Sequence, residues 1–144
     1  MKISTKGRYG LKAMLDIAVY SSSENVTLKS VSERENISEK YLEQIFSALR
    51  KNGLVNSKKG AQGGYTLSKS MSKITVGDIL RVLEGDLLVV QEDETEKDMM
   101  DKCIQKNIWD KLNSSINSIV NSITLEDLFY EYNKETNPEY IYYI

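Results

Sequence analysis

Residues 58–65, KKGAQGGY, limit the possible folds of this 144-residue chain more than any other segment. They hold three of its eight glycines and two adjacent lysines. Such a segment can form a phosphate-binding nest or the tip of a β-hairpin. A phosphate-binding P-loop needs a strand before it, a helix after it and a closing Lys-Ser or Lys-Thr. Here no helical pattern follows within reach, and the spacing is different.

The flanking residues favour the hairpin. Residues 54–59, LVNSKK, and 65–68, YTLS, alternate weakly between apolar and polar residues, as strands do. In a hairpin the glycines supply positive φ angles and a thin tip, and Lys58 and Lys59 are free to contact phosphates. A hairpin that has no partner is the plainer alternative.

Three helical patterns precede the hairpin. Ser4 or Thr5, Thr27 and Ser38 are suitable caps for helices over about 6–20, 28–35 and 39–51. The third has a buried stripe of Leu42, Ile45, Phe46 and Leu49 and ends at Asn52-Gly53. Two short helices joined by a Glu-Asn turn, the second with a polar face, resemble a helix-turn-helix. The fold class predicted is mainly α with one β-hairpin, a winged helix-turn-helix.

Charge is distributed unevenly along the chain. Residues 1–66 carry 11 Lys+Arg against 6 Asp+Glu, whereas residues 67–144 carry 8 against 15. This asymmetry indicates an anionic partner for the front half, although charge that only maintains solubility is the alternative. The chain has no apolar run of about 20 residues and no signal-like N-terminus, so we expect a cytoplasmic protein with no membrane partner.

Four stretches carry a family resemblance: ISTKGRYGLKAMLDIA, ISEKYLEQIFSALRKNGLV, KKGAQGGYTLSK and ITVGDILRVLEG. They resemble the Rrf-type winged-helix transcriptional regulators. The C-terminal TLEDL and the final YI are most similar to the CymR-type group, the repressors of cysteine metabolism. The resemblance implies a homodimer on a roughly palindromic operator of double-stranded DNA, with the helix-turn-helix in the major groove and the wing at the minor groove.

The resemblance also implies which residues contact DNA. They are Arg8 near the first helix, Ser38, Lys40, Tyr41 and Gln44 at the recognition helix, and Lys59 with Gly60, Gly63 and Gly64 on the wing. We expect Tyr41 and Gln44 to lie on the exposed face of the recognition helix and read base edges. Glu43 can accept a hydrogen bond from a cytosine amino group, or it is simply a surface charge.

The rear half is interpreted as a dimerisation region. Residues 1–85 form the predicted DNA-binding domain, ending in a helix over 76–84 that Thr75 caps, and residues 86–98 form an acidic connector. Residues 99–144 follow as a dimerisation helix and tail, with a last short helix opened by Thr124. The helix carries an apolar stripe at steps of three or four: Ile104, Ile108, Leu112, Ile116, Ile119 and Ile123. One short chain has little to cover this stripe, so we expect it to form the dimer interface.

Cofactor chemistry is limited by the residues available. The iron–sulfur members of the family use three cysteines in the connector, but this chain has one cysteine, Cys103, six residues before Trp109, and no histidine. A cluster needs about four thiolate or imidazole ligands, so we predict no metal and no cofactor. We expect Cys103 to be a small buried residue. A redox role stays open if its thiol is exposed and has a depressed pKa.

The chain ends in NPEYIYYI. The resemblance implies a complex with cysteine synthase (CysK), an O-acetylserine thiol-lyase whose active site captures partner C-termini ending in isoleucine. Tyr143 and Ile144 are then the partner-binding residues, and the terminal carboxylate mimics that of an amino-acid substrate. The alternative, in which residues 140–144 dock on their own dimer, stays open.

The sequence therefore predicts a DNA-binding repressor of cysteine or sulfur metabolism. Catalysis is not expected, because the chain offers no histidine and no usable nucleophile–base pair. Two alternatives remain: a redox- or iron-responsive regulator of the same family, and an interaction protein that inhibits an enzyme through its C-terminal tail.

Overall fold

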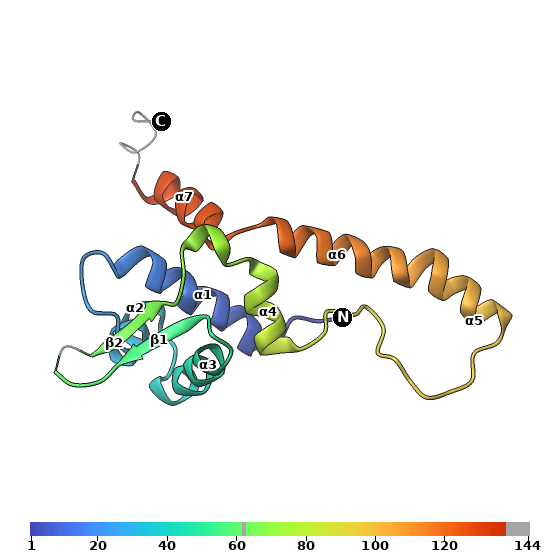
Figure 1. The fold of residues 1–144 in the computed structure, drawn as a ribbon, viewed down its shortest axis with the longest axis horizontal. Helices are drawn as coiled ribbons and strands as arrows, with labels where there is room; N and C mark the ends of the chain where they lie inside the picture. Colours follow the sequence, from blue (N-terminus) through green and yellow to red (C-terminus); the bar gives the residue numbers. More distant parts are fainter. Residues whose placement is uncertain (62, 138–144) are drawn as a thin grey trace.

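The computed structural model describes residues 1–61 and 63–137, and its elements are arranged as a winged module with a projecting arm (Figure 1). The module contains α1 (Thr5–Tyr20), α2 (Leu28–Glu35), α3 (Glu39–Lys51), β1 (Val55–Lys58), β2 (Gly64–Leu67), η1 (Met71–Lys73) and α4 (Val76–Glu84). The arm and the last helix are α5 (Met99–Ile104), η2 (Gln105–Trp109), α6 (Asp110–Ser122) and α7 (Leu125–Thr136). The predicted fold class is confirmed. None of the helices within the described residues is long and apolar enough to cross a membrane.

Short polar side chains begin the helices as the sequence predicts. The hydroxyl oxygens of Ser4, Thr27 and Ser38 accept hydrogen bonds from backbone N–H groups three residues on, at 3.2, 3.0 and 3.2 Å. These bonds satisfy donors that the first helical turn leaves free. Between α2 and α3 the backbone turns at Asn36, whose φ of 55° is a left-handed conformation that asparagine tolerates. The result is the predicted helix-turn-helix.

One hydrophobic core holds the winged module together. It includes apolar side chains from α1 to α4 and from the first strand, and it also includes Leu125 at the start of α7. Leu125 is fully buried, and its N–H donates to the carbonyl of Ile74 at 2.8 Å. Helix α7, which belongs to the predicted C-terminal segment, is therefore anchored on the winged module and packs against α1.

The arm is one continuous helical rod, but its apolar stripe differs from the predicted one. The rod includes a turn of π-helix, η2, and it ends at Ser122, so Ile123 lies beyond it in an extended conformation. Ile116 and Ile123 pack on Val76 and Leu80 of α4 in the same chain. The prediction that all six stripe residues lie on one long helix is wrong for Ile123. Two of the six are used inside the chain.

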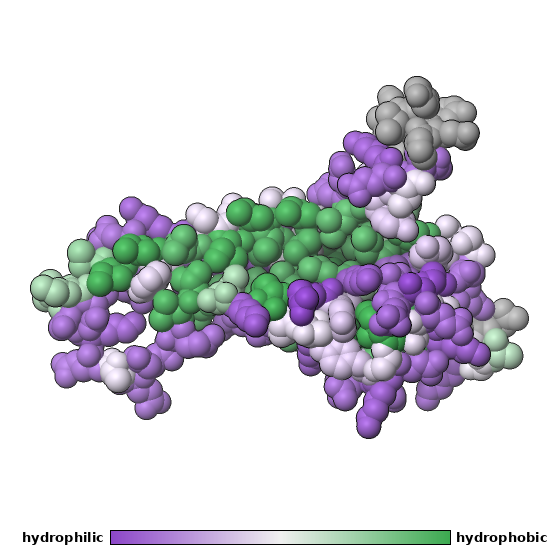
Figure 2. Space-filling model, turned by 180° about the vertical axis from the view of Figure 1, so that it is seen from behind, coloured by the Kyte–Doolittle hydropathy of each residue, from purple (hydrophilic) through white to green (hydrophobic). Residues whose placement is uncertain are grey.

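The remaining stripe residues are exposed in the single chain. Ile104, Ile108 and Leu112 are each a little under half exposed, and Ile119 is 58% exposed. Met99 and Met100 at the tip of the arm are 78% exposed. Seen from behind, the arm carries a continuous hydrophobic surface that reaches the winged module (Figure 2). This surface is the largest apolar feature that the described residues leave uncovered in that view.

The predicted acidic connector has no regular secondary structure over most of its length, and its side chains are mainly exposed. Leu87 is the exception, because it is buried with Val76 and Leu80. The side-chain oxygen of Asn113 on α6 accepts from the N–H of Val89 at 2.9 Å. The start of the connector is thus held between the module and the arm.

Candidate DNA-binding surface

The recognition helix α3 presents most of its predicted DNA-contacting side chains to solvent. Ser38, Lys40, Glu43 and Gln44 are exposed. Tyr41 is only half-buried, and its ring meets the ring of Tyr9 edge-on, with centroids 5.8 Å apart. Tyr41 is thus less exposed than Gln44, and its predicted contact with base edges stays a prediction. Its ring packs on α1, because the first turn of α3 lies close to that helix.

The predicted hairpin is confirmed as an antiparallel pair of strands, with Val55 opposite Leu67 and Lys58 opposite Gly64. Gly60 has a φ of 100°, a backbone conformation that residues with a side chain rarely adopt. Gly64 lies so close to the loop before α2 that an added Cβ would be 2.6 Å from the carbonyl oxygen of Val26. The glycines thus form the turn and permit the close approach. Lys58 and Lys59 are exposed at the tip.

Two contacts fix the wing relative to the helix-turn-helix. The rings of Phe46 on α3 and Tyr65 on β2 are stacked, with centroids 4.5 Å apart and an angle of 13° between planes. The N–H of Tyr65 donates to the carbonyl of Val26 at 2.7 Å. Because Phe46 is fully buried, the wing is joined directly to the core. Its orientation relative to the recognition helix is set by packing.

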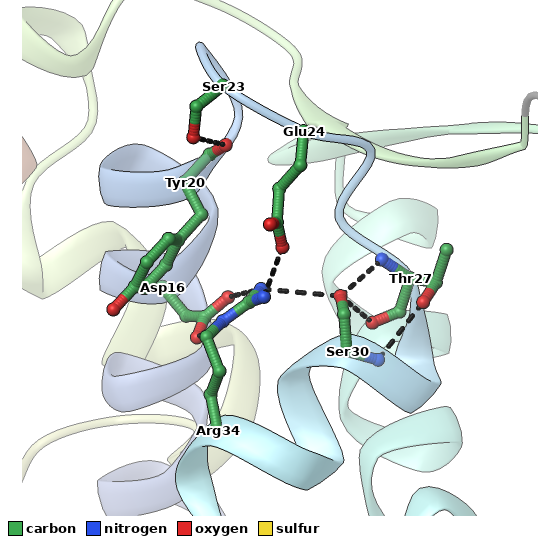
Figure 3. A network of polar contacts seen from close by, with 7 residues as sticks. All are labelled: Asp16, Tyr20, Ser23, Glu24, Thr27, Ser30 and Arg34. Carbon is green, nitrogen blue, oxygen red and sulfur yellow. Dashed lines mark hydrogen bonds and ion pairs between the residues drawn. The ribbon is translucent and has the colours of Figure 1, made fainter.

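An ion pair between buried Asp16 and half-buried Arg34 fixes α2 on α1 (Figure 3). Arg34 donates from Nε and Nη2 to the two carboxylate oxygens of Asp16 at 2.9 and 2.7 Å, and it also pairs with Glu24. Its guanidinium lies over the ring of Tyr20, 4.1 Å from the centroid. Asp16 is only 3% exposed, so Arg34 supplies the charge that makes its burial possible. The hydrogen bond to Asp16 raises the pKa of Arg34.

A small cleft of about 130 Å³ lies beside this pair, between α1, the end of α2 and α7. Glu35 lines it, with Oε1 3.9 Å from the Lys12 ammonium. Burial, followed by a hydrogen bond and charge repulsion from Asp16, raises the pKa of Glu35 to about 7. Tyr20 and Tyr132 of α7 also line this cleft, and the interaction with Tyr132 is the main cause of a raised pKa for Tyr20.

The structure brings six of the eleven predicted residues into one groove. Outside its lining lie Arg8 and four residues of the recognition helix and its cap: Ser38, Lys40, Tyr41 and Gln44. Glu43, Lys58, Lys59 and the three wing glycines line an open groove of about 630 Å³ between α2, α3 and the wing. Arg8 lies apart from the groove on the first turn of α1, where it donates to the Thr5 hydroxyl at 3.0 Å. Its exposed position remains compatible with a DNA contact.

Sequence reasoning missed two cations of this groove, Lys29 and Arg50. Glu43, Ser47 and Arg50 are spaced four and three residues apart, so they lie on the same side of α3, and all three line the groove. That spacing could have revealed Arg50. No comparable signal marks Lys29, because its place in the groove depends on how α2 packs beside the wing.

The donor set does not fit an iron–sulfur cluster. The chain has one cysteine and no histidine, and the described residues contain no group of three potential His, Cys, Asp or Glu ligands. The expectation that Cys103 is buried is wrong, because it is exposed on α5. It is a weak hydrogen-bond acceptor from the Asn107 amide at 3.7 Å. The arm leaves it exposed because that part of α5 lies beyond the winged module.

The helix-turn-helix, the glycine-tipped wing and the basic groove together define a winged helix-turn-helix protein of the DNA-binding type. The family model Rrf2, described as an iron-dependent transcriptional regulator, matches residues 3–131. The chain therefore belongs to the Rrf2 family. It is a transcription regulator and not an enzyme.

Named relatives of this chain are also regulators. It is 42% identical to the HTH-type transcriptional regulator CymR of Bacillus subtilis over 144 residues, which is the full length of both chains. It is 42% identical to the regulator IscR of Yersinia enterocolitica over 129 residues, covering 89% of this chain and 79% of that one. The solved structure of CymR, the global cysteine regulator of B. subtilis, matches with a TM-score of 0.78 over 91% of this chain and 98% of that chain.

Proposed function

We propose that this regulator is a homodimeric repressor of genes for cysteine or sulfur metabolism. The observation that carries the proposal is the similarity to CymR, which spans the full length of both chains. The similarity to IscR is equally high in identity but covers less of both chains. The lack of a cluster ligand set also favours the cysteine regulator over an iron-responsive one.

Sequencing the genomic DNA fragments that the protein binds tests which operator and which genes it recognises. The purified protein is mixed with sheared genomic DNA, and the fragments that it retains are sequenced. Fragments upstream of genes for sulfur assimilation or cysteine synthesis would support the proposal. Binding must also weaken as salt rises, because phosphate contacts release counterions. Retained fragments from iron or redox genes would favour the other branch of the family, and no retained fragment would favour an interaction protein.

We propose that the arm joins two copies of the chain. Its exposed stripe includes Ile108, Leu112 and Ile119, none of which is covered within the described residues. An apolar surface of this kind marks an interaction site, and a second copy supplies the same surface by two-fold symmetry. Ile116 and Ile123 instead fasten the arm to its own module. The interface is thus expected to use the other four predicted residues.

Sedimentation of an arm variant tests this assignment. Changing Leu112 and Ile119 to Asp buries unpaired charge in the proposed interface and should give monomers that bind DNA poorly. Changing Ser114 and Ser118 to Asp is the matched control, because both serines are exposed on the same helix. If the first variant sediments as a dimer, or the control as a monomer, the interface lies elsewhere.

The C-terminal partner is proposed on the resemblance alone. Tyr143 and Ile144 lie outside the described residues, so the proposal uses only their chemistry. A free carboxylate next to an apolar side chain matches what a cysteine synthase active site accepts. Calorimetry should detect binding of cysteine synthase to the full chain and none to a chain lacking Ile144. Added O-acetylserine should reduce binding by the full chain, and undiminished binding by the shortened chain would exclude this mechanism.

A further inference from the structure

The groove between the helix-turn-helix and the wing has basic residues on two walls. Lys29 from α2 and Arg50 from α3 line one side, and Lys58 and Lys59 of the wing line the other. Glu43 is the only acidic residue among those that line it. The groove is therefore strongly positive and open to solvent along its length.

Among the described residues, neither Lys29 nor Arg50 forms an ion pair. Within residues 1–61 and 63–137 the ion pairs closer than 4.0 Å involve Lys12, Arg34 and Lys134, and none involves these two side chains. Arg50 is exposed near the end of α3, and it is beside Lys51, which has the same charge but does not line the groove. Two free cations that face one groove are available for an anionic partner.

The walls of the groove are held in fixed positions. The stacked rings of Phe46 and Tyr65 join α3 to the wing, and the bond from the Tyr65 N–H to Val26 joins the wing to the loop before α2. The width of the groove is thus set before any partner binds. A preformed site loses less conformational entropy on binding than one that must be ordered.

The position of the groove indicates which part of DNA it holds. In the proposed complex the recognition helix enters the major groove, and the wing reaches the adjacent minor groove, as the family resemblance implies. The sugar-phosphate backbone that separates these two grooves must then pass between α3 and the wing. That space is the basic groove, so cations on both of its walls would face phosphates.

Building on the proposed DNA-binding function, we propose that this groove clamps one sugar-phosphate backbone and that Lys29 and Arg50 bind its phosphates opposite the wing lysines. The two residues contribute affinity and register but no base preference, since phosphate contacts carry no sequence information. Gln44 does not line the groove and keeps its proposed role of reading bases.

The test compares the double variant Lys29→Gln/Arg50→Gln with the wild type. Fluorescence anisotropy measures binding to a retained genomic operator and to random DNA of the same length at several salt concentrations. The slope of log K against log salt should decrease by about 1.8, because each lost phosphate contact removes about 0.9. The affinities for operator and random DNA should fall by the same factor.

Two further variants control for general charge and for folding. Lys51→Gln removes a charge of the same sign from the same turn of α3 and should leave the slope unchanged. Arg50→Lys keeps the charge and should retain the wild-type slope. Thermal unfolding by circular dichroism should match the wild type for all variants, because both groove residues are surface side chains.

Three results would overturn the clamp while leaving the DNA-binding function in place. They are an unchanged slope in the double variant, a loss confined to the operator, and an equal loss in Lys51→Gln. A wild-type protein that binds no DNA at all would instead remove the proposed function itself. The two failures are therefore distinguishable.

Discussion

Replacing Arg34 with Met tests whether the buried ion pair holds α2 in place. The change removes both hydrogen bonds to Asp16 and leaves a carboxylate that is 3% exposed without its cation. Breaking a buried pair in this way costs about 3–5 kcal/mol. The guanidinium contact with the Tyr20 ring adds about 0.5–1 kcal/mol. Because the Arg34 side chain is 20% exposed, we expect the low end of this range, a loss of about 4 kcal/mol in the free energy of unfolding, or roughly 13 °C in melting temperature.

Urea unfolding followed by far-ultraviolet circular dichroism measures this loss, with the protomer concentration held constant because assembly shifts apparent stability. Glu24→Gln is the matched control. It removes the other carboxylate partner of Arg34, which is 46% exposed at its side chain, and should cost under about 1 kcal/mol. The double variant Arg34→Met/Asp16→Leu removes the stranded charge and should recover at least about 2 kcal/mol relative to Arg34→Met.

Two outcomes would refute this account of the pair. Arg34→Met could cost no more than Glu24→Gln, which would mean that Asp16 is solvated or repaired by another group. Alternatively, the double variant could lose the sum of the losses measured for Arg34→Met and for Asp16→Leu alone. That additivity would show that the two side chains do not stabilise each other.

Three further predictions concern the cleft and the DNA surface. Because the folded pKa of Glu35, about 7, lies above its ordinary 4.5, the folded state binds more protons, so stability should fall as pH rises between these values. In urea unfolding, the free energy of Glu35→Gln should fall by about 1–2 kcal/mol less than that of the wild type over this pH range. Equal falls in the two proteins would contradict this prediction. Gln44→Ala should cost about 1–3 kcal/mol on the best operator and relax preference at particular base pairs, whereas equal loss on random DNA would make Gln44 a phosphate contact. Lys58→Ala/Lys59→Ala should weaken all DNA alike and lower the salt slope by roughly 1–2, and an unchanged slope would contradict the wing assignment.

The sequence predicts the winged module closely because its signals are local. Ser38 and Thr27 cap helices wherever they precede a helical pattern, and the glycines at 60 and 64 can be read as a hairpin tip without knowing the rest of the fold. The bounds predicted for α2, α3 and α4 match those in the structure. In these elements the local sequence preferences agree with the tertiary packing, so local signals are enough to predict where each helix begins and ends.

What the sequence does not predict depends on contacts between distant segments. Lys29 joins the groove only because α2 packs beside the wing. The burial of Asp16 beside Arg34 needs two helices to meet at one angle, and Tyr41 is half-covered because α1 brings Tyr9 against it. An apolar repeat also cannot tell which of its members are used inside the chain, as Ile116 and Ile123 are. Nor does the sequence show that Cys103 is exposed, because its exposure depends on α5 lying beyond the winged module.

Contacts between distant segments also fix the arm on the winged module, and this bears on the operator that the proposed dimer would bind. The base of the arm is fastened to the winged module by two backbone bonds, from Val76 to Ile123 and from Leu125 to Ile74, each 2.8 Å long. Arg81 on α4 also donates to the Asn117 side chain of α6 at 2.7 Å. Module and arm therefore move together, so the angle at which two arms pair sets the distance between two recognition helices. Operators bound by such a dimer should have half-sites one helical turn, about 34–36 Å, or a multiple of it apart.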